Sequence, residues 1–267
     1  MKPVARLLFH VFAVAVVVYL TLPMAIVVLM SFTPSRFLEL PTTSFSLQWY
    51  QAFFNDPKWL DGLRNSLIVS GMTIVIALIV GMTAALAFTR YKFRGSTALY
   101  TFSLVPVFTP AVILAMALLA FAYKAGLWGG YLIIAIGHAL WSFPLVLMVL
   151  KVSLEGLDES LEEAARGMGA SPLRTFFAVV LPLIAPATLV GALFAFIISI
   201  NEFVMALFLG TSDTETLPRI IYPILRYRLT PVVAAASGVL MLLTIAVLLL
   251  SARIMNLRKL IEFQRSV

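Results

Sequence analysis

The chain has 267 residues, of which 62% are hydrophobic and 12% are charged, and its mean hydropathy is +1.04. A soluble domain carries about 45–50% apolar and about 25% charged residues, so the composition excludes a soluble fold. The sequence contains no cysteine, which excludes a disulfide framework, a thiolate metal site and a cysteine nucleophile. A net charge of +7 is typical of the cytoplasmic loops of a membrane protein, and we expect no nucleic acid as a partner.

Six long uncharged runs follow one another along the chain. They are Leu7–Ser35, Asn65–Thr89, Gly95–Tyr123, Ala125–Leu150, Thr175–Asn201 and Leu229–Ala252. Each exceeds the roughly 20 residues that an α-helix needs to cross about 30 Å of hydrocarbon. We therefore predict an all-α membrane protein with six transmembrane helices, forming a single domain over residues 1–267. Pro106, Pro110 and Pro144 fall inside these runs and are expected to kink them.

The distribution of Lys and Arg predicts how the spans are oriented. Twelve of the 19 basic residues fall on one side of the six runs, among them Lys2, Arg90, Lys92 and Arg94. The other seven, among them Arg228, fall on the opposite side. Because cytoplasmic loops carry the excess of basic residues, we predict a multi-pass protein of the lipid bilayer with both termini in the cytoplasm.

The loop at residues 153–182, between the fourth and fifth runs, is the most informative part of the sequence. Five of the chain's 12 acidic residues lie at its start. Gly156 is expected to end the fourth helix in the left-handed conformation, and Asp158 to cap a short helix that follows. Gly169 should stop this helix, and Ser171-Pro172 should begin another as N-cap and first helical residue. The pattern predicts two helical stubs around a glycine bend.

One face of the first stub is apolar and the opposite face is acidic. The residues that recur at helical spacing on the apolar face are Leu157, Leu161, Ala164, Ala165 and Met168. Glu162 and Arg166 form an i, i+4 ion pair of the favourable order. A helix that lies on the anionic inner leaflet is usually basic, whereas this one is acidic. The pattern therefore favours docking into the groove of a partner protein over a loop packed on its own chain.

The same loop carries the spacing of a known family. Glu163-Ala164-Ala165 is followed after three residues by Gly169, and after nine more by Val179, one residue and Leu181-Pro182. This arrangement resembles the signature loop of the permeases of binding-protein-dependent ABC importers, the MetI-like family, in which Ile is frequent at the position of Val179.

Two further stretches carry the resemblance beyond the loop. Ala84–Gly95 is similar to the end of the second span in these permeases. Asn201–Leu209, followed by Thr216-Leu217-Pro218, resembles the polyamine-type branch, which includes the second permease of spermidine/putrescine importers. The resemblance implies a six-helix permease with a cytoplasmic coupling-helix loop, placed in the bacterial inner (cytoplasmic) membrane.

The resemblance also implies a set of partners. A sister permease would complete the substrate pathway, and the polyamine-type branch suggests that it is a different chain. Two cytoplasmic ATPase subunits would drive transport. A periplasmic substrate-binding protein would deliver the substrate. The chain itself has no G-x-x-x-x-G-K-[ST] run, so we expect no enzymatic activity and no cofactor on it. ATP and Mg would bind to the partner ATPase.

In this family the loop would contact the ATPase. The residues expected to do so are Leu161, Glu163, Ala164, Ala165, Met168 and Gly169. Glu163 would be the polar anchor, the two alanines would keep the face thin, and Gly169 would supply a bend that a β-carbon opposes.

Polar groups near the spans give a second set of candidates. Asn201 and Glu202 at the end of the fifth run, together with Tyr222, are candidates to line the translocation pathway. A carboxylate within a membrane usually lines a water-filled path, but one at a helix end also serves as a structural hydrogen-bond acceptor, and both interpretations stay open. His138 is expected to be a packed, hydrogen-bonded residue without a partner acid inside a span, and we predict no metal site.

The substrate suggested by the resemblance is a polyamine of the spermidine/putrescine kind. Arg219, Arg226 and Arg228 argue against a mouth that attracts only cations, so an opine, an aminophosphonate or another small organic solute remains an alternative. A stand-alone secondary transporter is the competing class, but it would need more intramembrane ionisable groups or an inverted repeat. An intramembrane hydrolase would need a buried acid beside His138.

Overall fold

The structure is a computed structural model that describes residues 3–41, 44–227 and 230–265. Lys2, Arg228 and Leu229, which enter the predicted topology and substrate argument, lie outside the described residues. The chain forms two compact units. Unit 1 consists of Met1–Leu60 and Ile220–Leu243, and unit 2 of Asp61–Arg219 and Thr244–Val267.

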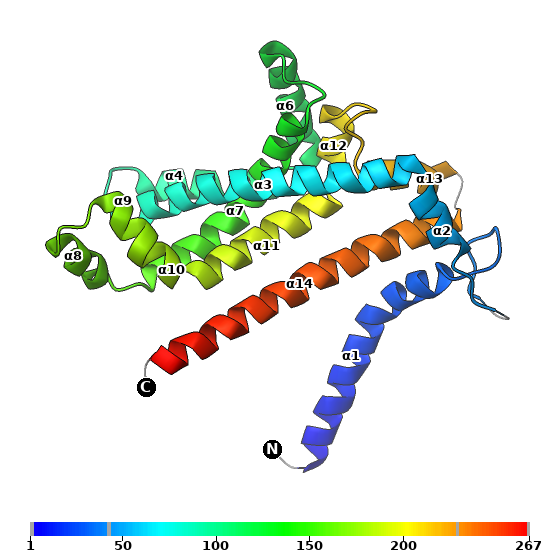
Figure 1. The fold of residues 1–267 in the computed structure, drawn as a ribbon, viewed down its shortest axis with the longest axis horizontal. Helices are drawn as coiled ribbons and strands as arrows, with labels where there is room; N and C mark the ends of the chain where they lie inside the picture. Colours follow the sequence, from blue (N-terminus) through cyan, green and yellow to red (C-terminus); the bar gives the residue numbers. More distant parts are fainter. Residues whose placement is uncertain (1–2, 42–43, 228–229, 266–267) are drawn as a thin grey trace. The chain divides into compact units, whose positions relative to one another are not determined.

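Four helices of the described chain are long and apolar enough to cross a membrane (Figure 1). They are α1 (Pro3–Met30), α3 (Pro57–Arg90), α7 (Tyr131–Glu155) and α14 (Pro231–Arg265). Two further stretches reach the necessary length only as bent pairs of helices, Ser96–Phe108 with Ala111–Ala125 and Pro172–Leu183 with Ala185–Asn201. Counted as one span each, they bring the number to the predicted six.

The first bent pair confirms part of the proline prediction. Its elements are α4 (Ser96–Ser103), α5 (Val105–Phe108) and α6 (Ala111–Ala125). The bend is 103° and falls at Thr109 and Pro110, whose ψ angles of 131° and 130° leave the helical region. Pro110 cannot donate a backbone hydrogen bond to the preceding turn, so the helix ends before it. Pro144, by contrast, lies inside the continuous helix α7.

The core of unit 2 holds α3, α7 and the fifth span together. One cluster of buried residues joins Ala77, Met82 and Ala85 of α3 to Val146, Leu147 and Leu150 of α7, and to Val180, Ile184 and Ala195 of the fifth span. A second cluster joins α6 and α7 to α12 (Val204–Leu209) through Ala115, Ala122, Ile133, Ile134, Met205, Ala206 and Leu209. Figure 1 shows α6 and α12 side by side.

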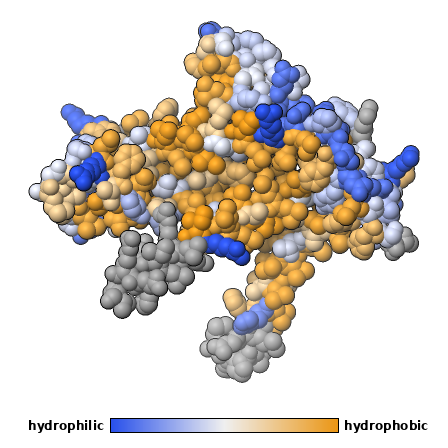
Figure 2. Space-filling model, in the orientation of Figure 1, coloured by the Kyte–Doolittle hydropathy of each residue, from blue (hydrophilic) through white to orange (hydrophobic). Residues whose placement is uncertain are grey.

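Unit 1 is built around the short helix α2 (Gln48–Asn55). The Tyr50 hydroxyl lies 2.8 Å from Ser31 Oγ, and the Trp49 indole donates to the Thr33 carbonyl at 2.9 Å. The apolar part of α1, residues 8–30, is 23 residues long. No residue in its most apolar stretch is buried within the chain. Figure 2 shows apolar residues over most of the visible surface of the helices, as expected of a protein surrounded by lipid.

Candidate functional site

The predicted start of the coupling loop, at residue 153, lies within the last turn of α7, which ends at Glu155. Gly156 follows as the C-cap, as expected, but its φ of −79° is right-handed, so the prediction of a left-handed cap was wrong. The next helix, α8, spans Ser160–Gly167, and its N-cap position falls on Glu159 rather than on Asp158 as predicted. Asp158 still stabilises the helix start, because its Oδ1 accepts the backbone N–H of Ser160 at 2.9 Å. Hydrogen bonds from the backbone and then the side chain of Ser160 lower the pKa of Asp158.

The bend between the two stubs has the geometry that the sequence predicts. Gly169 has a φ of +88°, which is the left-handed region that disfavours residues with a β-carbon. Ser171 then caps the second stub, α9 (Pro172–Thr175), with its Oγ accepting the Arg174 N–H at 3.3 Å. Both predictions for this part of the loop are confirmed.

The segment that follows is not the single uninterrupted helix expected over Thr175–Asn201. It consists of a π-helix, η1 (Phe176–Val180), then α10 (Leu181–Leu183) and α11 (Ala185–Asn201), with a bend of 77° before α11. Pro182 lies in the first turn of α10, and the first turn of α11 also contains a proline. Because proline has no backbone N–H, each interrupts the hydrogen bonding that would carry a helix through this point.

The six residues predicted to contact an ATPase do not all share one exposed face. Met168 is 84% exposed and Leu161 is 44% exposed, and Glu163, Ala164 and Gly169 are also exposed. Ala165 is only 6% exposed and packs inward. Five of the six residues are therefore accessible on this chain, while the sixth supports α8 from within.

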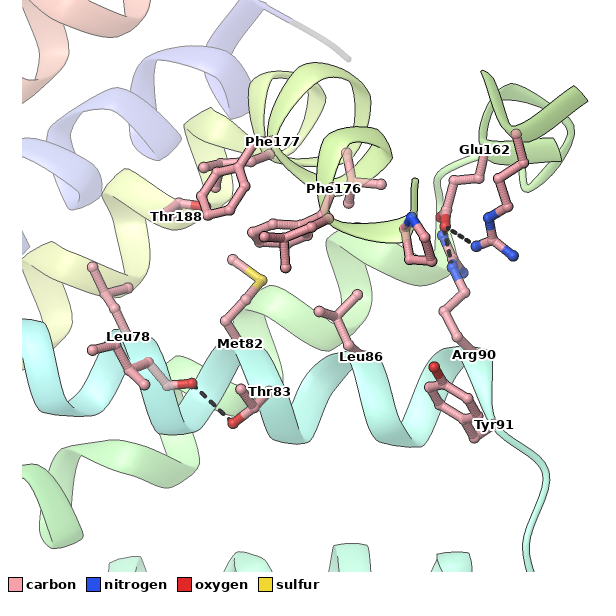
Figure 3. Close-up of a pocket in the computed structure, with 16 residues that line it drawn as sticks. Leu78, Met82, Thr83, Leu86, Arg90, Tyr91, Glu162, Phe176, Phe177 and Thr188 are labelled. Carbon is pink, nitrogen blue, oxygen red and sulfur yellow. Dashed lines mark hydrogen bonds and ion pairs between the residues drawn. The ribbon is translucent and has the colours of Figure 1, made fainter. Parts of the chain in front are cut away.

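An ion-pair cluster that the sequence did not predict fixes the start of α8. Arg90, the last residue of α3, donates from Nε to Glu162 Oε1 at 2.8 Å (Figure 3). Its Nη1 donates to Glu159 Oε1 at 3.3 Å. The predicted pair is also present, because Arg166 Nη2 donates to Glu162 Oε2 at 3.2 Å. The sequence signal was local and pointed to Arg166, whereas Arg90 lies 72 residues away in the chain.

A groove of about 560 Å³ lies next to this cluster, between α3 and the second stub (Figure 3). Its apolar walls come from Met82 and Leu86 of α3 and from Phe176 and Phe177 of η1. Arg90, Glu162 and Arg166 form its polar end. The cluster therefore lies at the boundary between an apolar groove and the exposed loop.

Glu202 occupies the break between α11 and α12 and is 3% exposed. Its carboxylate accepts the backbone N–H groups of Val204, Met205 and Ala206 at 2.9, 2.8 and 3.3 Å. These groups have no partner within α12, because the first turn of a helix leaves its N–H groups free. The carboxylate thus caps α12.

His138 of α7 lies beside this cap, which corrects the expectation that it has no partner acid inside a span. Its Nε2 is 3.2 Å from Glu202 Oε2, although the angle is not that of a hydrogen bond. Its Nδ1 is 2.8 Å from Ser199 Oγ, which in turn donates to Thr73 Oγ1 at 3.3 Å. The network links α3, α7 and α11 within the apolar core, and His138 is hydrogen-bonded as predicted.

The other two pathway candidates are placed differently. Asn201 is exposed, and its amide donates to the Ile197 carbonyl at 2.8 Å. Tyr222 is 46% exposed and lies in α13 (Leu217–Tyr227), in the part of that helix that belongs to unit 1. The roles proposed for Asn201, Glu202 and Tyr222 stay predictions.

The candidate membrane spans, two of which are bent pairs of helices, and the exposed loop that follows α7 are the features of a membrane permease subunit. Residues 74–261 match the family described as "Binding-protein-dependent transport system inner membrane component". The chain belongs to this family of inner-membrane permeases of ABC importers.

Two relatives with curated descriptions match most of the chain. The spermidine/putrescine transport system permease protein PotC of Haemophilus influenzae is 30% identical over 242 residues, which cover 91% of this chain and 94% of the relative. The putrescine transport system permease protein PotI of Escherichia coli strain K12 is 31% identical over 231 residues, covering 84% of this chain and 82% of the relative.

Solved structures share the fold at lower identity. A chain of a bacterial ABC transporter involved in the import of the acidic polysaccharide alginate has a TM-score of 0.70 at 18% identity, and the match covers 96% of this chain and 98% of that chain. A chain of the MetNI methionine ABC transporter has a TM-score of 0.60 at 18% identity, covering 74% and 94% of the two chains. The predicted MetI-like fold is thereby confirmed.

Proposed function

We propose that this permease forms half of a substrate pathway with a sister permease, and that its loop at residues 153–182 couples the pathway to a separate cytoplasmic ATPase. The observation that carries the proposal is the surface around the Gly169 bend. Met168 and Leu161 are apolar side chains that project from an acidic helix, with Glu163 exposed beside them. Apolar side chains exposed at a helix face are a signature of helix-in-groove recognition.

The proposed topology places both termini and this loop in the cytoplasm, where the ATPase subunits are. The resemblance to the polyamine-type branch supports a sister permease that is a different chain, and the family description supports a substrate-binding protein on the other side.

Cross-linking through single cysteines tests the coupling role, and the natural chain contains no cysteine that would interfere. Met168→Cys and Glu163→Cys, with a cysteine placed in the ATPase groove, should give a permease–ATPase adduct in membranes. Lys124→Cys, on the outer side in the proposed topology, is the matched control and should give none. Adducts of Lys124→Cys alone, or labelling of Met168→Cys by an impermeant maleimide from outside intact cells, would contradict the proposal.

We further propose that the substrate is a polyamine, because the two relatives at 30% and 31% identity are described as spermidine/putrescine and putrescine permeases. Uptake into proteoliposomes that contain both permeases, the ATPase and the binding protein tests this. Spermidine and putrescine should be taken up in an ATP-dependent way, and opines and aminophosphonates should not. Uptake of an opine or aminophosphonate alone would replace the substrate, and uptake without ATP would indicate a secondary transporter instead.

A further inference from the structure

The contact between Arg90 and Glu162 joins the C-terminal end of α3 to the first turn of α8 (Figure 3). The two side chains are 12% and 8% exposed, whereas their outer partners Glu159 and Arg166 are 64% and 55% exposed. The Arg90–Glu162 pair is therefore the desolvated centre of the cluster. Salt screens exposed ion pairs strongly, but a pair with this burial is screened much less.

The positions of the two charges on their helices add to this contact. Arg90 lies at the C-terminus of α3, where the helix dipole favours a cation. Glu162 lies in the first turn of α8, where the dipole favours an anion. The charge of Arg90 and the charge of Glu162 are thus each stabilised by the dipole of their own helix and by one another. This contact defines the direction of α8 relative to α3.

Apolar packing also joins α3 to this part of the chain, but it does so through η1 rather than through α8. The side chains of Met82, Leu86, Phe176 and Phe177 line the groove of about 560 Å³ beside the cluster. The buried core joins Met82 and Ala85 of α3 to Val180 of η1, whereas α8 itself is contacted through Arg90, which donates to Glu162 and to the neighbouring Glu159. Arginine suits such a contact, because its planar guanidinium presents several donors in a fixed geometry.

We propose that Arg90 is a positioning residue for the coupling step. Its guanidinium holds Glu162 and so fixes the orientation in which α8 presents Glu163, Leu161 and Met168. A force applied to α8 is then passed to α3, and from α3 to the spans packed against it. This inference rests on the proposed contact between the loop and an ATPase, and in this role Arg90 touches neither substrate nor nucleotide.

The test measures substrate uptake and ATP hydrolysis in the same proteoliposomes that contain the complete complex. The variants are Arg90→Gln, Glu162→Gln and the two combined. Arg94→Gln is the matched control, because it removes the same charge from an exposed position four residues further along. Each single variant should lower the amount of substrate taken up per ATP hydrolysed by about tenfold, a typical size for coupling between two sites.

The double variant separates a shared role from two independent ones. If Arg90 and Glu162 act through one contact, the double variant should lose no more than the more affected single variant. Arg90→Lys keeps the charge but not the planar fork, and it should give a ratio between those of the wild type and Arg90→Gln. Arg94→Gln should leave the ratio unchanged.

A wild-type ratio in Arg90→Gln would overturn the inference, as would losses that multiply in the double variant. If Arg90→Gln does not assemble with its partners, Glu162→Gln decides, since it removes the same contact from the other side: a reduced ratio supports the inference and a wild-type ratio refutes it. Failure of the proposed function is recognised separately, because the wild-type complex would then show no ATP-dependent uptake at all.

Discussion

Replacement of Glu202 by Ala should destabilise the protein strongly, and much more than replacement by Gln. In the wild type the buried carboxylate accepts three backbone N–H groups of α12 and lies 3.2 Å from His138 Nε2. Alanine leaves all four groups without this partner. Each buried donor left unsatisfied costs about 1–3 kcal/mol, so the loss of these contacts together should cost about 3–5 kcal/mol, more than the roughly 1 kcal/mol of an ordinary N-cap.

Glutamine keeps an amide oxygen that accepts from the same helix end but loses the charge next to His138. We expect Glu202→Gln to cost about 2 kcal/mol, within the roughly 1.5–3 kcal/mol of one hydrogen bond to a charged group. For a chain of this size, 1 kcal/mol changes the midpoint of thermal unfolding by about 2–4 °C. Glu202→Ala should therefore lower the midpoint by roughly 10 °C, and Glu202→Gln by roughly 4 °C.

Thermal unfolding of the purified protein in detergent measures these changes, and Asn201→Ala is the control. Asn201 is adjacent and exposed, with one hydrogen bond to the carbonyl four residues before it, so its loss should change the midpoint only slightly. Equal midpoints for Glu202→Ala and the wild type would refute the structural role. A Glu202→Gln variant with a normal midpoint but no uptake would instead support a carboxylate that lines the pathway.

Three further variants test the loop and the packing of the spans. Gly169→Val should add about 1–2 kcal/mol of backbone strain, because the φ of this residue is +88°, and it should lower the substrate taken up per ATP in proteoliposomes. Gly167→Ala is the control and should leave this ratio unchanged, since a β-carbon there meets open space and no positive φ. Glu163→Lys should insert normally but reduce co-purification of the ATPase, and unchanged recovery would contradict its role as anchor. Gly81→Leu should lower the midpoint of thermal unfolding, because even a β-carbon there would lie 2.8 Å from Val146 Cγ1. Adding Val146→Ala should restore part of the lost midpoint. A Gly81→Leu midpoint equal to that of the wild type would argue against close packing of α3 and α7.

The spans and the local features of the loop were predictable from the sequence because they depend on residues near one another. Long uncharged runs predict membrane helices from length and polarity alone. The bend at Gly169 and the cap at Ser171 follow from the preferences of single residues for particular backbone angles. The 77° bend before α11 was not predictable from length and polarity, because the uncharged run Thr175–Asn201 continues through it without a break.

The contacts between distant residues were not predictable in the same way. Helical spacing pairs Glu162 with Arg166, and that pair exists, but no periodicity pairs Glu162 with Arg90. Glu202 and His138 lie on different helices, and the sequence offered each of them only as an isolated polar residue in an apolar run. A polar group buried in an apolar environment requires a hydrogen-bond partner, so a partner for His138 was predictable, but not that Ser199 and Glu202 would be its neighbours.

The two adjacent glutamates of α8 illustrate how one helix serves two surfaces. Glu162 is buried and binds Arg90, while Glu163, one residue later, is exposed at the surface proposed to meet the ATPase. Successive residues on an α-helix point about 100° apart, since a turn has 3.6 residues, so neighbouring side chains cannot share one contact. The family signature begins at Glu163 and omits Glu162. Glu163, which would touch the partner, therefore lies inside the recognisable motif. Glu162, which orients the helix, lies outside the motif and is held by Arg90 of a different span.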